Sequence, residues 1–108
     1  MVTAKQRMKG HAAAKPTMDE LLATRERMNR ASLQFLKIDL QTALTFAKIA
    51  RETSDEWRMK RNRQAARKAY DTMMHLVPKV DVNADDRRVL SRGLVQLKSE
   101  LSALGEIF

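Results

Sequence analysis

The sequence contains no cysteine, which excludes a disulfide scaffold, a thiol nucleophile and a thiolate metal site within its 108 residues. Only three glycines and two prolines are present, too few to separate a series of short strands. Residues that favour strands are sparse, and most apolar side chains come from Leu, Met and Ala, a bias that favours helices. Length and composition together predict one all-α domain.

Long apolar runs are also lacking. No stretch approaches the roughly 20 apolar residues that cross a bilayer, so we expect no membrane partner and a cytoplasmic protein. The net charge of +8 is unevenly spread: +4 over residues 1–30, +1 over 31–53, +4 over 54–80 and −1 over 81–108. An acidic partner is therefore expected to meet residues 1–30 or 54–80.

The stretch 33–53 has apolar residues on two sides of a helical wheel, and polar residues make only one strip between them. Roughly 240° of its circumference is apolar, much more than a surface helix needs, so it is expected to be the central, most buried helix. One apolar side holds Leu33, Leu36, Leu40, Ala43, Leu44, Ala47 and Ala50, and the other holds Phe35, Ile38, Thr42, Phe46 and Ile49.

Residues 1–16 lack apolar periodicity and predict a flexible basic arm. Thr17 to Glu20 then has the form of a capping box, which predicts a helix start. No Gly or Pro interrupts the chain from there to Val77, so residues 18–53 form either one long helix or two helices. A break near residues 29–32 is favoured, because polar residues interrupt the apolar arc there, and Ser32 is a candidate cap for the second helix.

Two further helices follow. The stretch 55–77 has separate apolar and basic faces, and Asn83 is placed to cap a last helix. The complete expectation is an antiparallel three- to four-helix bundle with helices at about 18–30, 33–53, 55–77 and 84–104, which makes residues 17–108 one domain. Leucines spaced four and three residues apart predict the buried seam of the last helix: Leu90, Leu94, Leu97, Leu101 and Leu104.

No pattern of catalytic or ligand residues is evident. Neither His11 nor His75 has a carboxylate or a second histidine three or four residues further on, and there is no Gly-rich phosphate loop. Asp39 projects into the apolar arc, where an ion pair with an arginine of a neighbouring helix is expected and a catalytic or ligand-binding acid is the alternative. We predict no enzyme, no cofactor and no metal.

A basic cluster lies between Arg58 and Lys68. Such density is common on a solvated helix face, and it is also typical of a surface that follows phosphates. The alternative function is therefore a small nucleic-acid-binding protein that uses the N-terminal arm and this face. Its candidate contacts, to nucleic acid or to another acidic partner, are Arg58, Lys60, Arg61, Arg63, Arg67 and Lys68.

The leading prediction is a non-enzymatic helical adaptor that binds a protein partner or itself. The last two helices offer one apolar face each and cover only part of the wide arc of residues 33–53. The remainder must meet residues 18–30 folded back or a second copy, and a homodimer through the N-terminal helix would fit both the arc and the leucine seam. Candidate contacts for a protein partner are the apolar residues Trp57, Met74 and Phe108.

Residues 66–78, ARKAYDTMMHLVP, have a small residue, an aromatic residue four positions later and a proline eight positions after that. In this they resemble the second helix of a tetratricopeptide repeat, and the helix with Leu40, Leu44 and Ala47 stands where the first would be. The resemblance covers residues 40–78 and implies a single helical hairpin, because no second repeat follows.

Overall fold

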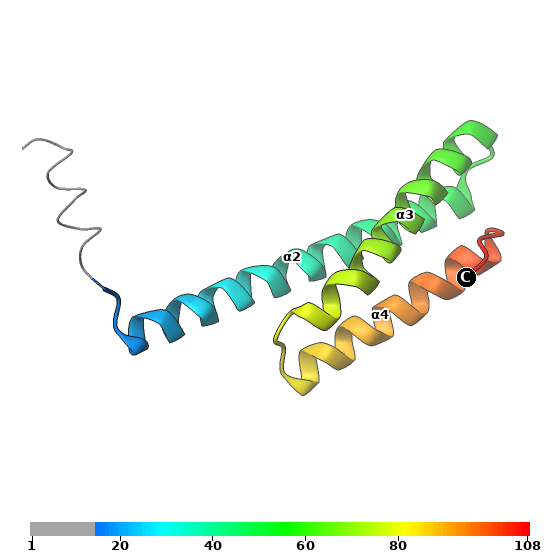
Figure 1. Cartoon of the computed structure of the whole chain (residues 1–108). Coiled ribbons are helices and arrows are strands. Elements are labelled where there is room, and N and C mark those ends of the chain that lie inside the picture. The colour runs from blue at the N-terminus through cyan, green and yellow to red at the C-terminus, as the bar shows by residue number, and fades with distance from the viewer. Residues whose placement is uncertain (1–14) are drawn as a thin grey trace, which may run out of the picture.

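A computed structural model describes residues 15–108, and within this range the chain is helical without strands, as the composition predicts. Three long helices are present, α2 (Met18–Glu52), α3 (Glu56–Leu76) and α4 (Ala84–Ala103), and a 3₁₀ turn, η1 (Val77–Lys79), follows α3 (Figure 1). Most of the predicted basic arm lies outside the described residues.

Each long helix starts at a side-chain cap that satisfies backbone N–H groups with no partner inside the helix. At α2, the Thr17 hydroxyl accepts from the Glu20 N–H at 3.1 Å, while the Glu20 carboxylate accepts from the Thr17 N–H at 3.3 Å. At α3, the Asp55 carboxylate accepts from the Trp57 N–H at 3.0 Å. At α4, the Asn83 side chain accepts from the Asp86 N–H at 2.8 Å. The caps predicted at Thr17 and Asn83 are confirmed.

The predicted break within residues 18–53 is wrong, because α2 is one helix of 35 residues. Ser32 lies inside this helix and caps nothing. Polar residues at 25, 29 and 32 interrupt the apolar arc but not the backbone, since exchanging such residues changes helix propensity by only about 0.5 kcal/mol. The separate helix at 18–30, folded back on the bundle, is therefore absent.

The helices pack over only part of α2. Figure 1 shows α3 running back along the C-terminal half of α2, with α4 running beside both, while the N-terminal part of α2 projects beyond them. The chain measures 67 × 34 × 18 Å along its principal axes. Every residue from Met18 to Met28 is exposed, so this part of α2 packs against no other described segment.

The core lies where the three helices meet. Its alanines bring the helix backbones close together, and Gly93 does so most: a Cβ at this position would collide with the Leu40 side chain. The leucine seam of α4 is buried as predicted, except that Leu104 is half-buried at the C-terminal end. The core side chains are Leu36, Leu40, Ala43 and Ala47 of α2, Ala66, Tyr70 and Met73 of α3, and Leu90, Leu94, Leu97 and Leu101 of α4.

Candidate functional site

The second apolar side of α2 is largely exposed, although Phe46 is half-buried against the core. We call the row of residues along it the outer seam, and its members are spaced three and four apart, as in one face of a coiled coil. The expectation that residues 33–53 are buried on most sides is thus wrong, because α3 and α4 cover mainly the face that holds Leu36, Leu40 and Ala43. The outer seam comprises Leu21, Thr24, Met28, Ala31, Phe35, Ile38 and Thr42, all of them exposed.

The large side chains of the outer seam face water to an unusual degree. Met28 is 65% exposed, Phe35 56% and Ile38 63%. The polar group of Thr42 is occupied within the helix, since its hydroxyl donates to the carbonyl of Ile38 at 2.9 Å. An aligned apolar surface of this kind on a soluble protein marks an interaction site more often than scattered apolar residues do.

A groove borders the outer seam where the projecting part of α2 leaves α3. Its volume is about 320 Å³ and its lining is almost wholly apolar. Ala31 and Phe35 belong both to the groove and to the outer seam, so the two surfaces are continuous. The full lining is Ala31, Ser32, Phe35, Leu36, Leu76 and Val80.

Asp39 lies at the edge of the outer seam. It is partly buried, and none of residues 15–108 forms an ion pair with it. The arginine partner expected from a neighbouring helix is therefore not present. The other charge at this edge, Arg25, is exposed and has no ion-pair partner in the same range.

Two members of the predicted basic cluster bind the C-terminal segment of the chain. The Arg63 guanidinium donates to the carbonyl of Leu104 at 3.1 Å and lies 3.4 Å from the Glu106 carboxylate. The Arg67 guanidinium donates to the carbonyl of Ile107 at 2.7 Å and lies 3.5 Å from Glu106. Both side chains are three-quarters buried, so their charges are largely used within the fold.

Phe108 packs on the same region. Its ring meets the Tyr70 ring edge-to-face with centroids 5.0 Å apart, and the Arg67 guanidinium lies 4.1 Å from its centroid. The ammonium of Lys98 on α4 lies 5.3 Å from the same centroid. Phe108 is nevertheless 45% exposed, so one part of its side chain packs against Tyr70 and Arg67 and the rest faces water.

The other four cations of the cluster, Arg58, Lys60, Arg61 and Lys68, remain exposed. Arg61 stacks over the Trp57 ring at 5.3 Å, and Lys60 lies 3.6 Å from Glu56. A groove of about 550 Å³ between α2 and α3 brings two of these cations together with aromatic side chains. Its lining is Phe46, Ile49, Trp57, Arg58, Arg61, Asn62 and Ala65.

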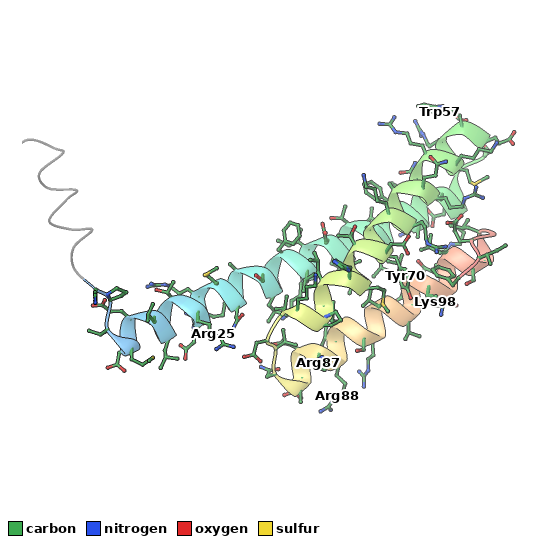
Figure 2. All side chains as sticks on the ribbon, viewed as in Figure 1. Arg25, Trp57, Tyr70, Arg87, Arg88 and Lys98 are labelled. Carbon is green, nitrogen blue, oxygen red and sulfur yellow. The ribbon has the colours of Figure 1, made fainter. Side chains whose placement is uncertain are left out.

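The three predicted protein contacts do not form one cluster. Trp57 lies in the first turn of α3 and Met74 in its last, about 25 Å apart at 1.5 Å per residue. Figure 2 shows Trp57 at the end of the molecule opposite to the point where the described chain begins. Residue 15 and Trp57, which directly precedes the basic cluster, therefore lie at opposite ends of the described chain.

The sequence predicts that part of the apolar arc meets residues 18–30 or a second copy, but it does not single out the outer seam. Phe35, Ile38 and Thr42 lie on the second apolar side of a helix that was expected to be the most buried one. The signal that identifies them is the unbroken spacing of three and four from Leu21 to Thr42, which runs through the supposed break.

Within residues 15–108 no three His, Asp or Glu side chains gather as a metal ion would need. None of the helices in this range combines the length and the apolar character that crossing a membrane requires. No family model, curated protein or solved structure matches the chain.

Proposed function

We propose that this chain is a non-enzymatic protein-interaction module that docks through the outer seam of α2. The single observation that carries the proposal is the exposed row of apolar residues from Leu21 to Thr42, which follows coiled-coil spacing on a helix that packs with its other face. A partner helix is the structure that such a row accepts most readily.

Stability favours a partner as well. The projecting part of α2, residues 18–28, has no packed neighbour among the described residues, and isolated helices of that length are marginal in water. Burying the large side chains of the outer seam would contribute roughly 4–8 kcal/mol before the costs of association. Association would thus order the projecting helix and cover its apolar surface together.

The proposal is tested by placing a photo-crosslinking amino acid at Met28 and, as a control, at Ser99, which is exposed on α4 away from the outer seam. Irradiation of cells that express each variant should give discrete protein adducts at Met28, removed by protease, and none at Ser99. Equal adduct patterns at the two positions, or no protein adduct at Met28, would show that the outer seam is not a docking surface.

A second candidate function is favoured by the groove that joins Trp57 with Arg58 and Arg61. An exposed aromatic ring beside cations is the arrangement that single-stranded nucleic acids stack on. Asn62, which lines the same groove, is the crosslinker position that tests it in the same experiment. Adducts there that are removed by nuclease support the second candidate, and their absence sinks it.

A further inference from the structure

We propose that the outer seam binds a second copy of this chain, with the two α2 helices antiparallel and related by a two-fold axis near residue 33. The inference rests on the proposed function, because it takes the outer seam as the docking surface and names its occupant. It adds a register, which states which residues of the two outer seams face each other.

The apolar layers fit in this register, in which the residue numbers of the two members of each layer add up to 66. Met28 faces Ile38 of the second copy, and Phe35 faces Ala31, so a large side chain meets a small one where the ring is bulkiest. Thr24 faces Thr42. Each layer occurs twice because the interface is isologous.

The charges that border the outer seam match in the same register. On one flank of the outer seam, Arg25 of one copy lies opposite Asp39 of the other; the facing numbers there add up to 64, because flanking positions are offset from the apolar layers. The two-fold axis repeats this pair, so the interface holds it twice. Asp39, partly buried and without an ion-pair partner among residues 15–108, thereby gains the arginine that its own copy does not provide.

Other pairings fit less well. In a parallel pair Phe35 would face Phe35 and Ala31 would face Ala31, which crowds one layer and leaves a void in the next. An antiparallel pair shifted by seven residues would place Asp39 opposite Met18 and Arg25 opposite Ser32, without an ion pair. Only the register centred near residue 33 matches both size and charge.

The rest of the fold leaves room for the second copy. α3 and α4 pack on the other face of α2, and the outer seam is exposed along its whole length. Covering the outer seams of two copies would remove on the order of 1,000 Å² from water, close to the roughly 1,200 Å² at which specific interfaces begin. A reversible dimer is the expected result.

Charge exchange tests the register. Sedimentation equilibrium should give a dimer mass at tens of micromolar. Arg25→Asp and Asp39→Arg should each weaken the dimer by at least about tenfold, because each puts like charges opposite one another. The double variant should restore the dimer to near its original strength. Arg92→Asp, the same charge change on exposed α4, should have little effect.

Disulfide crosslinking tests whether the two α2 helices run antiparallel. Because the sequence has no cysteine, the introduced cysteines can pair only with each other. Met28→Cys with Ile38→Cys in one chain should form disulfide-linked dimers, while either substitution alone should not. An internal disulfide is excluded, since ten residues of helix separate the two positions by about 15 Å.

Three results would overturn the inference: a monomer mass at tens of micromolar, a crosslink with Met28→Cys alone, or a double charge variant as weak as the single ones. A monomer whose Met28 still crosslinks to another protein would overturn only the second copy as occupant. A monomer with no protein adduct at Met28 would remove the proposed function too.

Discussion

Replacing Leu97 with aspartate will unfold the protein. The Leu97 side chain is completely buried at the centre of the α4 seam, within the core that all three helices share. The change removes an apolar side chain worth about 2 kcal/mol of burial and puts a carboxylate where none of its neighbours in the core is charged. The lost burial and the cost of the unpaired buried charge together are comparable to the 5–15 kcal/mol that typically stabilises a small domain. Circular dichroism at 25 °C should show the helical signal largely lost.

Val95→Asp is the matched control. Val95 is 70% exposed on the same helix, two residues away, so the same new charge there should change the free energy of unfolding by less than about 0.5 kcal/mol. A Leu97→Asp variant that melts like the control would mean that α4 does not pack with this face inward.

Gly93→Ala will destabilise the fold by about 1–3 kcal/mol, although alanine is the better helix former by about 1 kcal/mol. The added Cβ would collide with the Leu40 side chain, which is itself buried between α2 and α4. Urea unfolding measures the loss as a lower midpoint at an unchanged slope.

The companion substitution Leu40→Ala makes this prediction specific. Alone it should cost about 2–5 kcal/mol, because it leaves a cavity. Combined with Gly93→Ala it should cost less than the sum, since each change makes space for the other. Additive losses would show that Gly93 and Leu40 are not in contact, and the close approach of α2 and α4 would be wrong.

The parts of the fold that the sequence predicted are those with local causes. A cap such as Thr17 or Asn83 acts on residues within one turn, so its pattern is complete in a short stretch. The leucines of α4 repeat with the period of a helix buried on one face, and that face is indeed buried.

The predicted break in α2 is wrong because an interruption of the apolar face does not interrupt the helix. Arg25, Asn29 and Ser32 interrupt the inner apolar face near the point where α3 ends and α4 begins, and beyond that point this face lies in water. The helix itself needs no apolar residues to continue. The burial predicted for the second side of α2 rests on its apolar pattern, and such a pattern does not show whether any segment covers it.

The roles of Arg63 and Arg67 were not predictable from the sequence. Their partners lie 39 to 41 residues further along the chain, in the segment after α4. A cluster of cations on one helix predicts charge density and does not show which charges are used internally. The resemblance of residues 40–78 to a tetratricopeptide-repeat hairpin stays a prediction.

The most direct test of the central claim, that α2 is one helix whose N-terminal part projects and leaves the outer seam free, is a distance between spin labels. Labels at Ala23→Cys and Lys48→Cys, both on exposed positions of the polar side of α2, are measured by electron–electron dipolar spectroscopy in protein diluted with unlabelled chain. An unbroken helix places these two Cα atoms about 38 Å apart, at 1.5 Å per residue. A separation near 20 Å, as a segment folded back at residues 29–32 would give, would contradict the account.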